Sequence, residues 1–441
     1  MDKALQRAVE LTLTAAQGVT AYSGVHPWNY GWCNETYRRS NAAAVSSPSG
    51  AAQMSAEAVG RLEELHKLLA SNAKVRDRWD LEELWGVLAT LVAAVSASEN
   101  PPSSAERYIG HVMQAGSTLV VFPVANLRWD GEPLRVTRKS VIGVLNEEFC
   151  AAIQDLGQQS ETTANHISKY VRNLGHKFPC VGFATIVRGQ KKLAQEQARR
   201  SFRLVVDVAL MLATEKDRRN LWSMRGSHNR PGIRGLSMDR AATEAGLRAS
   251  GFDSELFSRP LLIDDNGPSS TVSWFSADPL PLESLFEDEQ LHEAVRLCLS
   301  DEAPVLKRLA VAARWYAESY WSESNDDAAL AAGVALDALI GSTSALPGRS
   351  MRERYALLEA DPTERSARAI EHAEIYTARS LVAHGGTSQK VDDVAFIRAM
   401  QDSVTWAAWR LIAMHRDLQV ANNKDLEAVL DGLRWGTHKW Q

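Results

Sequence analysis

The residues with the clearest chemical potential lie in the segment Ile375-Tyr-Thr-Ala-Arg-Ser-Leu-Val-Ala-His-Gly-Gly386. It places Arg379 five positions before His384. An arginine carries a permanent charge on a planar fork that binds two phosphate oxygens. A histidine titrates near neutral pH and transfers protons as a general acid or base. Together these residue types suit metal-independent cleavage of RNA, in which the ribose 2′-hydroxyl attacks the neighbouring phosphate.

Spacing alone does not select this pair, because the chain contains three other arginine–histidine pairs with similar spacing: Arg61/His66, Arg365/His372 and Arg410/His415. Gly385 and Gly386 are typical of a helix that ends just after His384. A helix carboxyl end favours a cation through the helix dipole. We expect the other three pairs to be structural. Arg61/His66 lies in a leucine-rich helix before the β region, Arg365/His372 lies early in the same helix as the favoured pair, and Arg410/His415 lies in the final helix without a terminating glycine.

The region from Glu302 to Asp417 resembles the HEPN ribonuclease family, in particular its Apea-like branch. The resemblance rests on a helix like Ala335-Leu-Asp-Ala-Leu339, which precedes a helix of the pattern Tyr-x-x-Arg…His-Gly. It implies a helical bundle that forms a homodimer, in which two such helices face each other across a composite cleft. It also implies that His384 is the general acid or base and that Arg379 positions and stabilises the phosphate.

The same resemblance suggests roles for neighbouring residues. Ser380 occupies a position where the family often has Asn, Asp or His, and we include it in the catalytic set. Asp337 occupies the position of a glutamate that commonly holds the arginine. Tyr376 lies one helical turn before Arg379 and is expected to line the cleft beside RNA. Gly386 stands where one branch of the family carries a tyrosine that accepts a nucleotide, so we expect no control of that kind.

These features predict a metal-independent endoribonuclease that leaves a 2′,3′-cyclic phosphate and a 5′-hydroxyl and needs no cofactor. By resemblance, its biology is bacterial antiphage defence or toxin-like growth arrest. The N-terminal region is expected to sense a trigger, bind RNA or hold a partner protein. Two alternatives remain open. The bundle is a non-catalytic dimerisation or RNA-binding module, or the chain is a scaffold subunit of a larger defence complex.

Charge is segregated in the middle of the chain. Residues Arg188 to Arg234 include 12 basic and 4 acidic residues, and residues Gly251 to Glu302 include 12 acidic and 2 basic ones. With Trp222 and His228 interleaved, the basic run predicts a phosphate-binding surface. Its candidate RNA-binding residues are Lys191, Lys192, Arg199, Arg200, Arg218, Arg219 and Arg225. Alternatively, the run is a solvated helix face that docks on the acidic segment of the same chain.

Composition limits the class of protein. The 441 residues carry a net charge of -5 and are 45% hydrophobic, which excludes a disordered or fibrous chain. Four scattered cysteines without a CxxC pair predict neither a metal site nor a disulfide framework. The chain lacks the GxxxxGK[ST], GxGxxG, HExxH and GxSxG motifs. We find no signal peptide and no apolar run of about 18 residues, so we expect a cytoplasmic protein without membrane contact.

The predicted fold class is α+β, in three parts. Residues 1–110 are expected to be mostly helical, with a small-residue linker at Asn41–Ala52. Residues 111–285 are expected to form a mixed α/β domain, and residues 286–441 an all-α HEPN-like bundle. In the first part, Ser103 and Glu106 have capping-box spacing after two prolines, which predicts a helix start there.

In the middle part, Asp130-Gly131 predicts a hairpin turn between a strand at Ser117–Leu127 and a return strand at Leu134–Leu145. The other predicted elements are helices near Glu147–Leu156 and Lys191–Ala213 and short strands at Gly182–Val187, Pro260–Ile263 and Thr271–Phe275. The last part predicts four main helices and a short one, from apolar spacing and helix-end signals. The four main helices are one with an apolar stripe from Leu306 to Tyr320, one at Leu330–Ile340, one that begins at Asp361-Pro362 and ends at Gly385-Gly386, and one at Val391–Asp417. The short helix is Met351–Glu359.

Overall fold

The computed structural model contains both helices and strands, which confirms the α+β class. The structure describes residues 3–21, 43–47, 50–114, 117–125, 127–156, 181–188, 191–213, 232–233, 280–299, 304–341, 347–386, 388–438 and 440. Backbone contacts divide the chain into two compact units. One comprises Met1–Val120, Ile186–Ala198 and Gly251–Asp253, and the other comprises Val121–Thr185, Arg199–Ser250 and Ser254–Gln441. The division into three parts stays a prediction.

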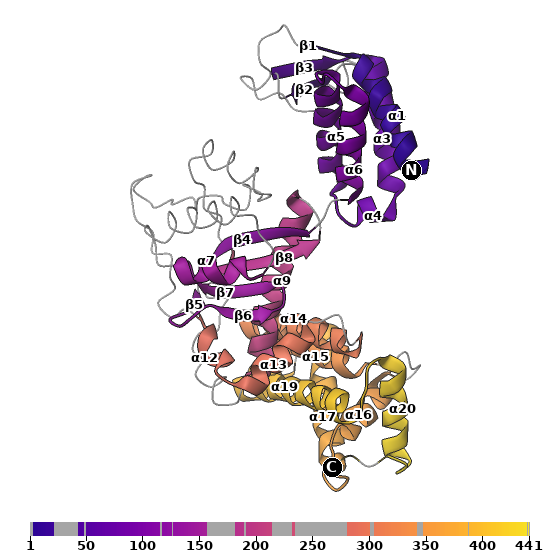
Figure 1. Ribbon diagram of the computed structural model, residues 1–441. Helices are drawn as coiled ribbons and strands as arrows, with labels where there is room; N and C mark the ends of the chain where they lie inside the picture. Colours follow the sequence, from indigo (N-terminus) through magenta and orange to yellow (C-terminus); the bar gives the residue numbers. More distant parts are fainter. Residues whose placement is uncertain are drawn as a thin grey trace. The chain divides into compact units, whose positions relative to one another are not determined.

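The N-terminal unit consists of helices beside a small antiparallel sheet with strand order β1-β3-β2 (Figure 1). The helices are α1 (Lys3–Gln17), α3 (Ala56–Ser71), α4 (Ala73–Arg76), α5 (Leu81–Ser96) and α6 (Pro101–Gln114). The strands are β1 (Val19–Ala21), β2 (Ala43–Ser47) and β3 (Gly50–Met54). Leucines 62, 65 and 69 of α3 pack with Leu84 and Leu88 of α5 in the core.

One expectation for this unit is wrong, and one predicted helix is confirmed with its start two residues earlier. The presumed linker at Asn41–Ala52 contains β2 and most of β3, which pair from Ala43 to Met54. Its small residues give no hydrophobic alternation, so the pattern does not indicate a strand. The helix after residue 100 begins at Pro101 rather than at Ser103, because Asn100 caps it. The Asn100 side chain accepts a hydrogen bond from the Ser103 amide at 3.3 Å. Proline is tolerated in the first turn of a helix, because the amides there have no partner within the helix.

The middle of the chain forms a five-stranded sheet with strand order β6-β7-β8-β4-β9. The strands are β4 (Ser117–Ala125), β6 (Leu134–Thr137), β7 (Ser140–Val144), β8 (Val181–Arg188) and β9 (Gly232–Ile233). Nearby elements are β5 (Leu127–Arg128), β10 (Leu280–Pro281), α7 (Glu147–Gln154), α9 (Lys191–Leu212) and α12 (Leu282–Phe286). Phe122 of β4, Phe183 of β8 and Phe202 of α9 form a buried aromatic cluster.

The predicted hairpin through Asp130-Gly131 is wrong. The stretch Leu134–Leu145 folds on itself as the β6–β7 hairpin, whereas β4 lies on the far side of β8. The Asp130 amide donates instead to the Glu283 carboxylate at 2.6 Å, so this turn contacts α12. The predicted strand at Gly182–Val187 and the two predicted helices of this part are confirmed. The strands predicted at Pro260–Ile263 and Thr271–Phe275 lie outside the described residues.

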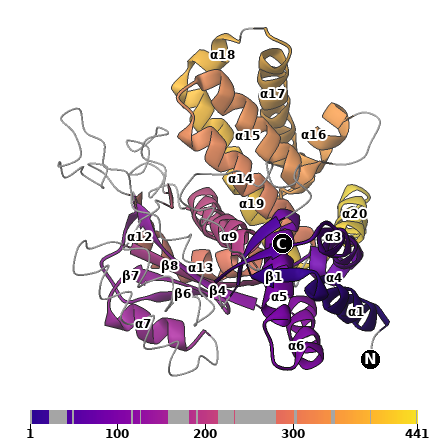
Figure 2. The same cartoon turned by 90° about the horizontal axis from the view of Figure 1, so that it is seen from above.

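The C-terminal part is helical, as predicted, and α15 lies at its centre in contact with α14, α17 and α19 (Figure 2). The helices are α13 (Glu289–Cys298), α14 (Lys307–Trp321), α15 (Asn325–Ile340), α16 (Pro347–Leu357), α17 (Arg365–Ala383), α18 (Gln389–Asp392), α19 (Val394–Asp417) and α20 (Asn423–Arg434). Buried alanines along α15 allow its neighbours to approach closely.

Several helix boundaries differ from the prediction: α15 begins at Asn325 rather than Leu330, and α16 spans Pro347–Leu357 rather than Met351–Glu359. Helix α17 begins at Arg365, because Asp361 instead forms a turn in which its carboxylate accepts from the Thr363 amide at 2.9 Å. The expected final helix is interrupted at Asp393, whose side chain caps α19. Helix α20 follows as an additional amphipathic helix, which a capping box at Asn422 begins. No helix in the described residues has the length and apolar character that a membrane crossing requires.

Candidate active site

Arg379 and Asp337 connect two helices of the bundle. Arg379 lies on α17, and its Nη2 contacts the Oδ2 of Asp337 on α15 at 2.5 Å. The two side chains are 23% and 26% exposed, so the ion pair is partly shielded from solvent. A partly buried ion pair fixes the direction of a long side chain more firmly than a surface pair does. The acidic residue at this position therefore holds the guanidinium in place.

Gly333 makes this arrangement possible. It lies one turn before Asp337 on α15, and a Cβ added there would be 2.5 Å from the Cγ of Arg379. Any other residue would therefore displace the arginine stem. The sequence analysis did not identify this residue. The available signal was a glycine inside an alanine-rich helix, where glycine costs about 1 kcal/mol relative to alanine.

The environment of Asp337 affects its titration. Burial raises the pKa of Asp337 to about 6, and the positive charge of Arg379 opposes this increase. Arg379 contributes one further polar atom to the site. Its Nε is buried and has no hydrogen-bond partner in the described part of the chain. The guanidinium is thus anchored through one nitrogen and retains unused donor capacity.

Tyr376 lies beside Arg379 on α17. The centroid of its ring is 5.9 Å from the Cζ of Arg379 and 6.2 Å from the His372 ring, on which it stacks. Gly348 of α16 lies against the same ring, since a Cβ there would be 3.0 Å from it. His372 is buried, and burial lowers its pKa to about 4. Tyr376 therefore packs between Arg379 and the interior while remaining half-buried.

His384 is exposed where α17 ends, as the glycine pair predicts. Gly385 adopts a left-handed backbone conformation with φ of 74°, which glycine accommodates readily. Its amide donates to the Val382 carbonyl at 3.0 Å, and the Gly386 amide donates to the Leu381 carbonyl at 2.9 Å. These two bonds form a Schellman motif. The imidazole of His384 makes no hydrogen bond or ion pair with any described residue, so it is open to an external group.

No hydrogen bond, ion pair or ring contact joins Arg379 to His384 in the described part of the chain. Five positions along a helix separate two side chains by about 140° around its axis. Arg379 accordingly faces α15, whereas the His384 imidazole has no partner in the described ranges. Ser380 is half-buried beside Arg379. One chain thus assembles Arg379 with Asp337 and Tyr376, and leaves His384 apart from them.

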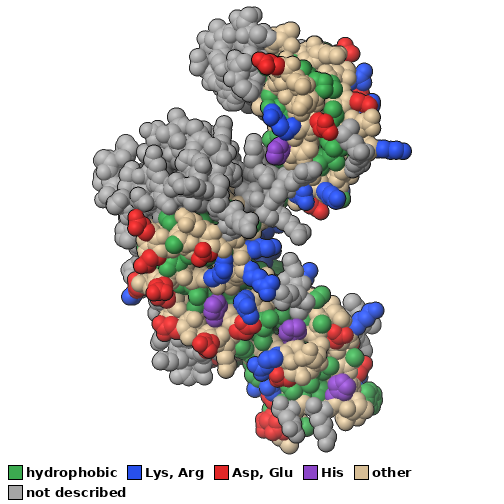
Figure 3. Space-filling model, in the orientation of Figure 1, with side chains coloured by type: hydrophobic (Ala, Val, Ile, Leu, Met, Phe, Trp, Pro, Cys, Tyr) green, Lys and Arg blue, Asp and Glu red, His purple; other side chains and the backbone are tan. Residues whose placement is uncertain are grey.

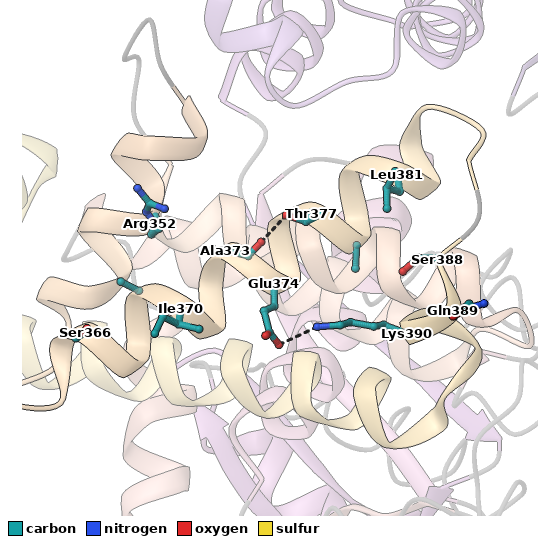
Figure 4. Close-up of a pocket in the computed structure, with 12 residues that line it drawn as sticks. Arg352, Ser366, Ile370, Ala373, Glu374, Thr377, Leu381, Ser388, Gln389 and Lys390 are labelled. Carbon is teal, nitrogen blue, oxygen red and sulfur yellow. Dashed lines mark hydrogen bonds and ion pairs between the residues drawn. The ribbon is translucent and has the colours of Figure 1, made fainter.

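An open groove of about 730 Å³ runs along the outer face of α17 (Figure 4). Two large apolar side chains line it, Ile370 at 61% exposure and Leu381 at 45%. An ion pair of 3.2 Å between Glu374 and Lys390 crosses the groove. Ile370 and Leu381 lie about three helical turns apart, with Glu374 between them in the sequence. These two exposed apolar side chains are candidates for contact with another molecule.

The predicted basic surface is described only in part. Arg199 and Arg200 are exposed on α9, and Lys and Arg side chains gather over this region (Figure 3). Lys191 and Lys192 form the first turn of α9, and their side chains lie outside the described part. The remaining predicted members lie outside the described residues: Arg218, Arg219, Trp222, Arg225 and His228. The basic surface therefore stays a prediction, with Arg199 and Arg200 as its described members.

The other three histidines of similar spacing have internal roles, as expected. His66 contacts the Leu81 carbonyl through Nε2 at 2.8 Å, and His415 contacts the Val420 carbonyl through Nδ1 at 2.7 Å. His372 is buried in the bundle. Within the described ranges, no three His, Cys, Asp or Glu side chains cluster in a way that could hold a metal ion. No protein-family model, curated protein or solved structure matches the chain.

Proposed function

We propose that this protein is a metal-independent endoribonuclease of the HEPN type, with its active site at the carboxyl end of α17. The observation that carries the proposal is the Arg379–Asp337 ion pair, formed beside a helix end that exposes His384. The pair supplies an oriented cation for a phosphate, and the free imidazole supplies a group for proton transfer. Both belong to a helical bundle of the kind that the sequence resemblance implies.

The proposed reaction uses the ribose 2′-hydroxyl as the nucleophile. His384 acts as general base and removes its proton while the 2′-oxygen attacks phosphorus. The bond from phosphorus to the 5′-oxygen breaks, and a protonated histidine supplies the proton that this leaving oxygen takes up. Arg379 contacts the non-bridging oxygens and offsets the charge that grows on them. The products are a 2′,3′-cyclic phosphate and a 5′-hydroxyl. Ser380, the residue after Arg379, is included in the proposed catalytic set on the sequence resemblance alone.

A homodimer resolves the separation of Arg379 from His384. We propose that two C-terminal bundles associate so that two copies of α17 together form a composite cleft for RNA. The exposed Ile370 and Leu381 support such an association, because burying apolar surface contributes about 25 cal/mol per Å². Arg199 and Arg200 on α9 are further proposed contacts for the RNA backbone.

We propose that the protein acts in the bacterial cytoplasm, in antiphage defence or toxin-like growth arrest. The N-terminal unit would bind the trigger, RNA or a partner protein. A second candidate is a non-catalytic RNA-binding or dimerisation module, or a scaffold subunit of a defence complex. The observation in its favour is that Asp337 neutralises Arg379 between two helices, as in a structural cross-link.

Expression in bacteria distinguishes the two candidates. Wild type, Arg379→Ala and His384→Ala would be induced in parallel, with growth and total RNA followed in the same cultures. Arg416→Ala is a matched control, because Arg416 is an exposed arginine on α19. The nuclease predicts arrest and fragmented RNA for wild type and the control only. If a phage challenge is needed to trigger activity, protection that survives loss of both residues would contradict the nuclease.

A further inference from the structure

Helix α16 packs beside the half of α17 that carries the proposed active site. Near the start of α16, Gly348 lies against the ring of Tyr376. Further along α16, the ring of Tyr355 contacts the ring of His372, with 5.4 Å between the two centroids. The contacts on α17 thus move backward along its sequence as α16 proceeds. The two helices are therefore antiparallel, and the first turns of α16 lie nearest to Arg379.

Two arginines lie in these first turns of α16. Arg349 and Arg352 are three positions apart, so they share one side of the helix, and both are exposed. Neither guanidinium makes a hydrogen bond or ion pair with a described residue. Given the antiparallel packing, they lie beside residues 373–376 of α17. Measured along the axis of α17, this stretch is about 5–9 Å from Arg379.

His372 also relates Arg352 to Arg379. Burial lowers the pKa of His372, and the positive charges of Arg352 and Arg379 lower it further. Both guanidiniums therefore lie within electrostatic range of one imidazole. Arg352 in addition lines the groove on the outer face of α17, at the end opposite Ser388 and Lys390 (Figure 4). Its side chain thus borders the groove as well as the surroundings of the proposed active site.

The described acidic side chains of α16 and of the groove leave these two charges unneutralised. Glu353 of α16 is paired with an arginine of α20 at 2.6 Å, and Glu374 of the groove is paired with a lysine of α18 at 3.2 Å. Guanidinium groups bind phosphate oxygens through paired donors. Arg349 and Arg352 therefore offer two exposed forks to an anion that carries more than one phosphate.

We propose that Arg349 and Arg352 form a second phosphate-binding site, which holds an RNA strand on one side of the scissile phosphate at Arg379. This inference rests on the proposed function, because it extends the same substrate along α16. Contacts to phosphates carry no sequence information, so the site adds affinity for any sequence. The substrate class is an RNA strand that continues beyond the scissile phosphate, rather than a dinucleotide.

Binding of 2′-O-methyl RNA tests this site apart from cleavage, because that RNA lacks the attacking hydroxyl. Fluorescence anisotropy measures the affinity of the full chain for a labelled oligonucleotide at several salt concentrations. Each phosphate contact on a single strand contributes about 0.7 to the slope of log affinity against log salt concentration. We expect Arg349→Gln/Arg352→Gln to reduce the slope by about 1.4. An unchanged slope would overturn the proposal.

Two further variants show whether position or total charge matters. Lys307→Gln/Arg314→Gln is the matched control, because both residues are exposed on α14 and have no partner among the described residues. This control should keep the wild-type slope. Arg349→Lys/Arg352→Lys retains both charges and should keep most of it. An equal reduction in the α14 control would indicate a general charge effect and contradict the site.

The length of the RNA separates this site from Arg379. A dinucleotide has one phosphate, so wild type and Arg349→Gln/Arg352→Gln should bind it equally, whereas a longer strand should bind wild type more tightly. Equal losses for both lengths would contradict a second site. If the expected slope change occurs but unmodified RNA stays intact, the phosphate site stands and the nuclease proposal fails. Absence of RNA binding by wild type would overturn both.

Discussion

The Arg379 side chain lies across Gly333 of α15 and reaches Asp337 one turn further along the same helix. Gly333 and Asp337, four positions apart on α15, therefore form a binding position for one arginine side chain. The aliphatic part of the Arg379 side chain packs on the backbone of Gly333, and its guanidinium contacts the Asp337 carboxylate. This arrangement gives Arg379 a defined direction before any phosphate arrives, which is what a phosphate-positioning residue requires.

Gly333→Ala is expected to destabilise the protein, because its Cβ would overlap the Arg379 stem. Overpacking of this kind costs about 1–3 kcal/mol. The same change in an Arg379→Ala background should cost less, since the clashing atoms are gone. Urea denaturation of the four proteins measures this coupling. Gly60→Ala, in α3 with no neighbouring atom within 4 Å, is the control and should not destabilise. Equal costs in both backgrounds would show that Gly333 does not position Arg379.

Asp337→Asn is expected to change how stability depends on pH. The folded-state pKa of Asp337 is about 6, above the ordinary value of 3.8. Folding therefore takes up a proton between these values, and the stability contributed by the protonated form is lost as pH rises through 6. Relative to the asparagine variant, wild type should gain at most about 3 kcal/mol as pH falls from 7 to 4. Parallel stability profiles for the two proteins would contradict the buried carboxylate.

His372 is expected to act in the opposite direction. Burial lowers the pKa of His372 to about 4, and the positive charges of Arg352 and Arg379 act in the same direction, whereas the negative charge of Glu371 opposes them. The rings of Tyr355 and Tyr376 flank the imidazole. The neutral imidazole contributes stability above its ordinary pKa of 6.5, and that contribution is lost as pH falls toward 4. His372→Phe should therefore reduce acid destabilisation in this range, as measured by urea denaturation at several pH values. An unchanged acid limb would show that another group controls it.

Much of the candidate site could be predicted from sequence because its signals are local. Gly385 and Gly386 mark the end of α17, and the alternation of small and apolar residues marks α15. Gly333 and the groove could not be predicted, because they depend on how α15, α16 and α17 pack against one another. The predicted strand pairing in the β-sheet was wrong for the same reason. A turn signal at Asp130-Gly131 identifies a turn but not which strands pair across it.

Association through α17 is expected to depend on its exposed apolar residues. Glutamates in place of Ile370 and Leu381 would introduce like charges into the proposed contact, so the double variant should shift dimers to monomers by at least about tenfold in dissociation constant. Sedimentation velocity measures the distribution. Val311→Glu is the matched control, because Val311 is 51% exposed on α14 and not part of the groove. A strictly monomeric wild type would remove the composite cleft.

The most direct test of the central claim is cleavage of a defined RNA by purified protein in the presence of EDTA, followed by analysis of the product ends. We predict 2′,3′-cyclic phosphate and 5′-hydroxyl ends for wild type and Arg416→Ala. Loss of the proton-transfer group typically costs about 10²–10⁴-fold in rate, and His384→Ala should lose at least that much. Arg379→Ala should be comparably impaired. Cleavage by His384→Ala and Arg379→Ala at the wild-type rate would contradict the claim that these residues form the active site.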